Sequence, residues 1–184
     1  MNVKHKNQRI GIFIDIQNLY HSAKNLYNKR VNFKNLLLEA VSDRFLIRAI
    51  AYAAKSAEPG EESFFEALKK NGIEVKRKDL QVYPDGTKKG DWDVGLAIDA
   101  IRIGENLDTI VLISGDGDFV PLVEYLKNKG KYVEVMAFSR TASARLKEIA
   151  DEFIDLDERP EYFLLKSEET SLRVKIPIIR IKRK

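Results

Sequence analysis

Acidic side chains follow two strongly apolar runs of this sequence. Asp116 and Asp118 come shortly after residues 110–113, and Asp15 comes directly after residues 11–14. An aliphatic run that ends in Asp or Gly is typical of a buried strand that enters a tight turn. Open α/β folds place their ligands at the carboxyl ends of such strands. We therefore expect these three carboxylates at the carboxyl edge of a sheet.

A cation would stabilise carboxylates that lie this close together, because like charges repel one another. A further acidic segment supplies Asp91, Asp93 and Asp99. The chain has no cysteine and only two histidines, so its available ligands are the hard oxygens that suit Mg2+ or Mn2+. In two-metal phosphodiesterases, ions about 3.5–4 Å apart clamp the scissile phosphate. The residue types therefore predict metal-dependent phosphoryl chemistry.

Structural roles compete with this interpretation. Asp118 and Asp91 each precede an expected helix and are candidates for N-caps, while Asp116 suits an Asx turn. Asp99 lies among apolar residues, where a buried carboxylate needs a partner. Asp93 and Asp99 are six residues apart, so on a helix their side chains would point about 120° away from each other around the axis. Both can be ligands only if Asp93 lies at or before the first turn of its helix.

Strand-like and helix-like segments alternate along the chain. The expected strands are residues 9–14, 45–54, 73–78, 109–113 and 131–138, with a short edge strand at 153–156. The expected helices are residues 18–27, 32–41, 60–70, 119–128 and a last one at 142–150, with another that Asp91 or Asp93 caps and that runs to about residue 103. A turn is expected at residues 83–87. This alternation indicates an α/β fold, with a parallel sheet and helices on both faces. Right-handed crossovers would bring Asp15 and Asp116 to the same edge.

The length of 184 residues is that of about one domain. The first residues are polar and lack the apolar core of a signal peptide, and no run of residues reaches the roughly 18 apolar positions of a membrane span. We therefore expect a cytoplasmic protein that does not enter a membrane.

Basic residues are concentrated in two segments. Residues 159–184 carry eight Lys or Arg against three Glu, and residues 69–89 carry seven against three acidic residues. An acidic cluster flanked by basic segments suits a polyanion that is held by its phosphates, although Lys-rich faces also serve solubility alone. We expect a main domain at residues 1–158 and a basic tail at residues 159–184. The tail alternates apolar and basic residues, which is consistent with an added strand that pairs with another copy in a homodimer, or with a flexible basic arm.

Three segments of the chain resemble the NYN domain family, and more narrowly its LabA-like group within the PIN-like nuclease superfamily. They are residues 13–19, 89–99 and 114–122, and the resemblance covers about residues 8–156. It implies a Rossmann-like PIN fold, with a mainly parallel central sheet and helices on both faces. It also implies a ribonuclease that depends on Mg2+ or Mn2+ and acts on single-stranded or structured RNA.

The motif match assigns roles to particular residues. It implies that the catalytic, metal-binding acidic residues are Asp15, Asp93, Asp116 and Asp118, with Asp99 as a further metal ligand. The residues expected to contact or position the substrate are Asn18, Ser114, Lys88 and Lys89.

Two other functions remain open at this point. One is a catalytically weak RNA-binding or regulatory module with the same fold. The other is a phosphatase or nucleotide hydrolase, but the Asp-x-Asp signature is absent at Asp15 and the chain has no Walker loop.

Overall fold

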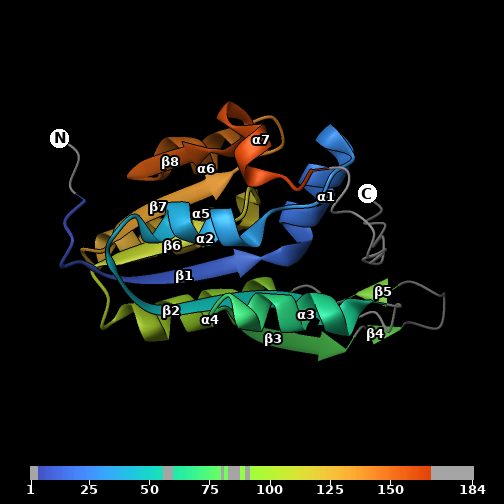
Figure 1. The fold of residues 1–184 in the computed structure, drawn as a ribbon. Coiled ribbons are helices and arrows are strands. Elements are labelled where there is room, and N and C mark those ends of the chain that lie inside the picture. Colours follow the sequence, from blue (N-terminus) through green and yellow to red (C-terminus); the bar gives the residue numbers. More distant parts are fainter. Residues whose placement is uncertain (1–3, 56–59, 80, 83–87, 90–91, 167–184) are drawn as a thin grey trace.

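A six-stranded parallel sheet forms the centre of the protein (Figure 1). The computed structural model describes residues 4–55, 60–79, 81–82, 88–89 and 92–166. The strands, in their spatial order, are β3 (Glu74–Asp79), β2 (Phe45–Lys55), β1 (Arg9–Asp15), β6 (Thr109–Ile113), β7 (Tyr132–Ala137) and β8 (Glu152–Asp155). All five neighbouring pairs in this sheet are parallel. The expected α/β fold with a parallel sheet is confirmed.

Helices cover both faces of the sheet. One face carries α1 (Ile16–Tyr27), α2 (Phe33–Val41), α3 (Glu61–Lys70) and α7 (Pro160–Phe163). The other carries α4 (Asp93–Gly104), α5 (Val120–Asn128) and α6 (Ala144–Ile149). No helix in the described part of the chain is both long enough and apolar enough to cross a lipid bilayer.

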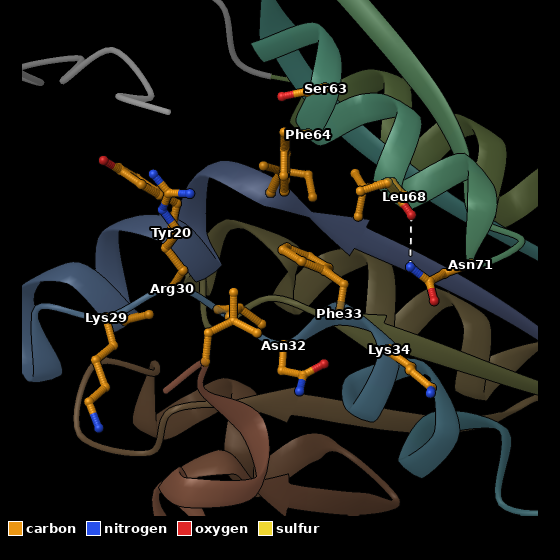
Figure 2. A pocket seen from close by; sticks show the side chains of 15 residues that line it. Tyr20, Lys29, Arg30, Asn32, Phe33, Lys34, Ser63, Phe64, Leu68 and Asn71 are labelled. Atoms are coloured by element: carbon orange, nitrogen blue, oxygen red, sulfur yellow. Dashed lines mark hydrogen bonds between the residues drawn. The ribbon is translucent and has the colours of Figure 1, made fainter. Parts of the chain in front are cut away.

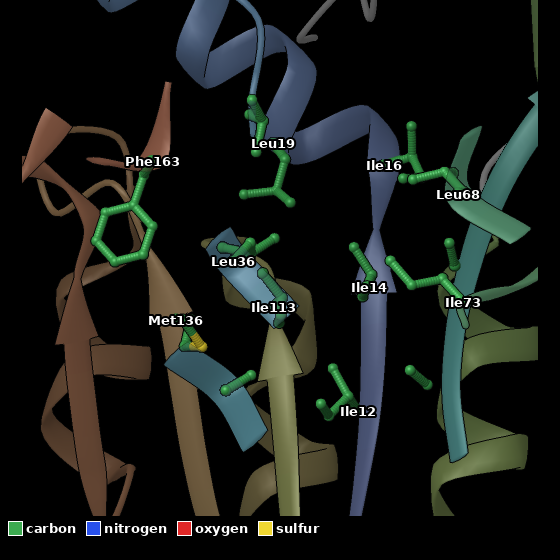
Figure 3. Close-up of a cluster of buried hydrophobic side chains, with 14 of the residues drawn as sticks. Ile12, Ile14, Ile16, Leu19, Leu36, Leu68, Ile73, Ile113, Met136 and Phe163 are labelled. Atoms are coloured by element: carbon green, nitrogen blue, oxygen red, sulfur yellow. The ribbon is translucent and has the colours of Figure 1, made fainter. Parts of the chain in front are cut away.

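The alternation of side chains along β1 divides the core into two clusters. Ile12 and Ile14 point to the face of α1 and α2, where they lie in one cluster with Leu19 and Leu36 (Figure 3). Phe13 points to the opposite face and belongs to the cluster under α4 and α5. Because successive residues of a strand point to opposite faces, a strand that is covered on both sides must be apolar throughout.

The chain changes direction across the sheet between β1 and β6. From β1 it proceeds outward through β2 to β3, and then returns to β6 on the other side of β1 before continuing to β7 and β8. Such a reversal leaves a crevice at the carboxyl ends of the two central strands, where open α/β sheets bind their ligands. The fold therefore identifies the edge at Asp15 as the position to search for a site.

The C-terminal part of the described chain differs from expectation. The helix α6 was expected to be the last, but α7 follows it, and Phe163 is fully buried against α1 and α2. A backbone bridge joins Leu164 to Val31. Residues 160–165 therefore pack on the main body, while residues 167–184 lie outside the described residues and the role of the tail stays a prediction.

A two-stranded antiparallel ladder, β4 (Gln81–Val82) and β5 (Lys88–Lys89), precedes α4. The turn expected at residues 83–87 lies between its strands, outside the described residues.

A buried ion pair lies at the opposite edge of the sheet. The guanidinium of Arg44 donates to the two carboxylate oxygens of Glu134 at 2.5 and 2.9 Å, and both side chains are buried. Arg44 also donates to the carbonyls of Ala40 and Val41 at the end of α2. This pair fastens the end of α2 to β7.

Candidate metal centre

A buried serine connects the ends of β1 and β6. The strands are in register at Ile14 and Ile113, so the next residues, Asp15 and Ser114, lie side by side. The hydroxyl of Ser114 donates to Oδ2 of Asp15 at 3.0 Å and accepts the backbone N–H of Asp116 at 3.2 Å. One side chain therefore sets the position of Asp15 relative to the loop that carries the other two aspartates.

Asn18 and Gly115 also hold in place the loop that carries Asp116 and Asp118. The side-chain oxygen of Asn18 accepts the backbone N–H of Gly115 at 2.9 Å, and the carbonyl of Gly115 accepts from the backbone of Ser143, also at 2.9 Å. A Cβ atom at Gly115 would lie 2.9 Å from the Cα of Ala142. Only glycine fits this close approach, which is why the loop needs one there.

Three carboxylates converge beside this loop. Asp93, Asp116 and Asp118, the acidic triad, each offer an oxygen, and these oxygens lie within 4.8 Å of one another. Asp116 caps the short 3-10 turn Gly117–Phe119 and accepts the backbone N–H of Asp118 at 3.0 Å. Asp118 is exposed and the other two are half-buried, so the triad opens to solvent.

The helix α4 brings Asp93 to the triad. Asp93 is its first residue and Trp92 is its N-cap, so the expected capping role of Asp93 is wrong, and Asp91 lies outside the described residues. The indole of Trp92 donates to the carbonyl of Ala53 at 2.9 Å, which anchors the start of α4 to β2. Trp92 is thus a packing residue that helps to hold Asp93 in place.

The chemistry of the triad fits a hard divalent cation. All of its side-chain donors are carboxylate oxygens, the ligands that Mg2+ and Mn2+ prefer. Within the described part of the chain, neither Asp116 nor Asp118 forms an ion pair with Lys, Arg or His. Since like charges at this separation repel one another, a bound cation would lower the free energy of the group.

Asp15 lies next to the triad in a different environment. Its burial raises the pKa of the carboxyl from 3.8 to about 6. Hydrogen bonds from the backbone of Asn18 and the hydroxyl of Ser114 oppose this rise, and the nearby charge of Asp116 adds to it. Asp15 also caps α1 by accepting the N–H of Asn18 at 3.1 Å. It is therefore a carboxyl group that titrates close to neutral pH.

Asp99 was expected among the metal ligands, and the structure gives it other partners. Its carboxylate accepts the hydroxyl of Tyr52 at 2.8 Å and the ammonium of Lys76 at 2.5 Å. Burial alone would raise the pKa of Asp99, but these two hydrogen bonds outweigh it and lower the pKa. The sequence correctly indicated that this carboxylate needs a partner, but the partner is a lysine, and Asp99 is not part of the triad.

The residues expected to contact the substrate fall into three groups. Ser114 is fully buried and uses its hydroxyl within the site, so it positions the aspartates instead. Asn18 is half-buried and its side-chain oxygen is occupied, which leaves its amide N–H groups for a substrate contact. Lys88 and Lys89 form β5, and their side chains lie outside the described residues.

A largely apolar pocket with three basic side chains among its lining residues was missed by the sequence interpretation. It has a volume of about 260 Å3, lies between α1, α2 and α3, and is lined by Tyr20, Phe33 and Phe64 together with Lys29, Arg30 and Lys34 (Figure 2). The signal was present in residues 29–34, where three cations and an aromatic residue are interleaved within six positions. We define this hollow as the α1–α3 pocket.

Comparisons with known proteins agree with the fold. Residues 9–157 match the NYN domain family. The chain is 27% identical over 180 residues to the "Low amplitude and bright protein LabA" of Synechococcus elongatus. The aligned region covers 93% of this chain and 95% of that protein. It is 33% identical over 97 residues to the uncharacterized protein MJ0482 of Methanocaldococcus jannaschii, or 52% of this chain and 39% of that protein.

A solved structure has the same fold over most of the chain. The protein of unknown function VPA0982 from Vibrio parahaemolyticus superimposes with a TM-score of 0.80 at 35% identity, and the match covers 88% of this chain and 99% of that one.

Proposed function

The chain belongs to the NYN domain family, and on this basis we propose that it is a ribonuclease that hydrolyses phosphodiester bonds with the help of Mg2+ or Mn2+. The observation that carries the proposal is the acidic triad, whose three carboxylate oxygens lie within 4.8 Å of one another. The triad is at the edge where the strand order reverses, the position at which this class of sheet binds ligands.

The triad would hold the cation through Asp93, Asp116 and Asp118. A divalent cation at such a site lowers the pKa of water and polarises the phosphoryl oxygens. Because these ligands come from α4 and from the loop after β6, the geometry of the site depends on how α4 is anchored.

Asp15 is suited to a separate task beside the triad. A carboxyl group with a pKa of about 6 can take up a proton near neutral pH. The hydrogen bond from Ser114 to Oδ2 and that from Asn18 to Oδ1 hold the carboxylate in one orientation. We assign Asp15 the role of accepting the proton that the attacking water loses, and Ser114 that of a positioning residue.

RNA is the substrate that we propose, as single strands or structured molecules. The chain carries a net charge of +4, and its basic residues are concentrated in residues 69–89 and 159–184, which favours a polyanionic substrate. The cytoplasmic location stays a prediction, as does a homodimer.

The test is cleavage of a mixture of single-stranded and hairpin RNAs in Mn2+, Mg2+ or EDTA. Asp116→Asn keeps the size of the side chain and removes one ligand charge, so it should abolish a metal-dependent activity of the wild type. The matched control is Asp43→Asn, which makes the same change at an exposed residue in the left-handed conformation that Asn tolerates.

The results separate the two main functions. Metal-dependent cleavage that Asp116→Asn abolishes and Asp43→Asn retains would support the ribonuclease. Failure of the wild type to cleave any RNA, together with RNA binding, would favour a binding or regulatory module. Equal cleavage by the wild type and Asp116→Asn would contradict the proposed site.

A further inference from the structure

We propose that the α1–α3 pocket binds one nucleotide of the RNA strand, with the base against the aromatic side chains that line the pocket and the phosphate at its basic side chains. The identification of this nucleotide as part of the substrate rests on the ribonuclease activity proposed above. No member of the acidic triad lines the pocket, which lies among the helices on one face of the sheet (Figure 2).

The walls of the pocket suit a flat apolar group. Phe33 begins α2 and Phe64 comes from α3, and their rings meet edge to face with centroids 5.6 Å apart. Both rings are half-buried, as is Tyr20 on α1, so each keeps some surface open to a ligand. Aromatic side chains bind bases of any sequence by stacking. A volume of about 260 Å3 is slightly below the usual range for ligand pockets, which indicates a small guest such as a single nucleoside.

The charges around the pocket favour an anionic ligand. Lys29, Arg30 and Lys34 line it, and none of its lining residues is acidic. Lys29 and Lys34 are exposed, and neither forms an ion pair with another described residue. A ligand with a flat ring and a phosphate would pack against the aromatic side chains and pair with the basic ones.

The same charges argue against the basic tail as the occupant. The last described residues end beside the pocket, which Leu165 lines. Residues 167–184 carry six Lys or Arg against two Glu, so their net charge has the same sign as that of the three cations of the pocket.

The pocket and Asp15 share helix α1. Asp15 caps α1, and Ile16 and Tyr20 of that helix line the pocket. Tyr20 is five residues after Asp15, a rise of about 7.5 Å along the helix axis. Helix α1 therefore runs from the edge of the sheet that carries the site to the pocket, and an RNA strand that occupies both would follow this helix.

The test measures RNA binding without cleavage. Full-length protein in EDTA is titrated into a fluorescein-labelled, single-stranded RNA of seven nucleotides, and anisotropy is recorded over a series of salt concentrations. Ala67 is exposed on α3 and lines the pocket, so Ala67→Trp fills the pocket without changing a charge. Because stacking of one base contributes roughly 1–3 kcal/mol, this variant should bind about tenfold more weakly or worse, with an unchanged salt slope.

A second variant tests the phosphate contact. Lys34 lies in the first turn of α2, where an acidic residue favours the helix, so Lys34→Glu should fold at least as well as the wild type. It should weaken binding about tenfold and make the salt slope shallower by about 0.7, the value for one phosphate of a single strand. Lys34→Arg should keep the affinity. The control Lys129→Glu makes the same charge change on the opposite face of the sheet and should have a smaller effect.

The outcomes distinguish this inference from the ribonuclease proposal. If the wild type cleaves RNA but Ala67→Trp binds and cleaves like it, the pocket inference is overturned and the ribonuclease stands. If no RNA is cleaved but Ala67→Trp still loses RNA binding, the nucleotide pocket is supported and the ribonuclease fails. If adenosine 5′-monophosphate binds in the pocket while RNA binding is insensitive to Ala67→Trp, the guest is a free nucleotide and the inference is overturned.

Discussion

Replacing Asp15 with asparagine should stabilise the protein in the absence of metal, although it damages the site. The carboxyl of Asp15 has its pKa raised to about 6 by burial, so ionisation of this group opposes folding. Asparagine has nearly the same shape, and its side-chain oxygen can still accept the backbone N–H of Asn18. The substitution therefore removes the charge and keeps the cap of α1.

The direction and size of the change in the free energy of unfolding follow from the pKa values of Asp15 in the folded and unfolded states. The folded protein holds the Asp15 proton up to about pH 6, whereas an unfolded chain releases it near 3.8. The stability contributed by this group is therefore greatest below pH 4 and is lost as pH rises to 6 and above. The difference in pKa corresponds to about 3 kcal/mol at pH 8. Asp15→Asn avoids this loss, so it should be up to about 3 kcal/mol more stable than the wild type at pH 8 and no more stable at pH 4.

Urea denaturation in EDTA at pH 4, 6 and 8, followed by circular dichroism, measures this difference. Thermal melts should agree, since 1 kcal/mol corresponds to about 2–4 °C for a chain of this size. The control is Asp99→Asn, because the hydrogen bonds from Lys76 and Tyr52 lower the pKa of Asp99. That variant should be less stable than the wild type at pH 8, with the loss shrinking in acid. An Asp15→Asn variant that is less stable than the wild type at pH 8 would refute the reasoning.

Three further changes test other parts of the structure. Gly115→Ala places a Cβ 2.9 Å from the Cα of Ala142. Urea denaturation should therefore show a loss of about 1–3 kcal/mol in the free energy of unfolding, and RNA cleavage should fall as well. Unchanged stability and cleavage would mean that the loop can move to accommodate the extra methyl group. Arg44→Met leaves Glu134 charged and buried, which should cost about 3–5 kcal/mol in the same assay, and a loss below 1 kcal/mol would contradict the importance of the pair. Removal of residues 167–184 should weaken RNA binding and make its salt slope shallower, and an unchanged salt slope would exclude the tail from binding.

The strands and the convergence of the site were predictable because they depend on local pattern. The run of residues 110–113 is apolar at every position, as a strand covered on both faces must be, and its end was placed correctly. Right-handed crossovers then bring Asp15 and Asp116 to one edge, which the structure shows. Both inferences used rules that hold for parallel sheets in general.

The partner of Asp99 was not predictable in this way. The register of β2 and β3 pairs Tyr52 with Lys76, so both side chains reach the same carboxylate on α4. Register between distant strands depends on the packed structure and is not encoded in a short motif. A carboxylate in an apolar segment therefore indicated a buried partner without revealing which one.

The short helix α7 was missed for a related reason. Its four residues are too few for a periodic pattern, and its formation depends on Phe163 filling the core beside α1 and α2. The α1–α3 pocket forms where three helices meet, so the sequence alone did not indicate that the cations of residues 29–34 line a pocket.

The most direct test of the central claim is to locate manganese in crystals of the protein. Crystals soaked in MnCl2 and measured at a wavelength near the manganese absorption edge should show an anomalous peak between the carboxylates of Asp93, Asp116 and Asp118. The same measurement on Asp116→Asn should show a weaker peak or none. A strong peak at another position, or none at the triad of the wild type, would contradict the account of this site.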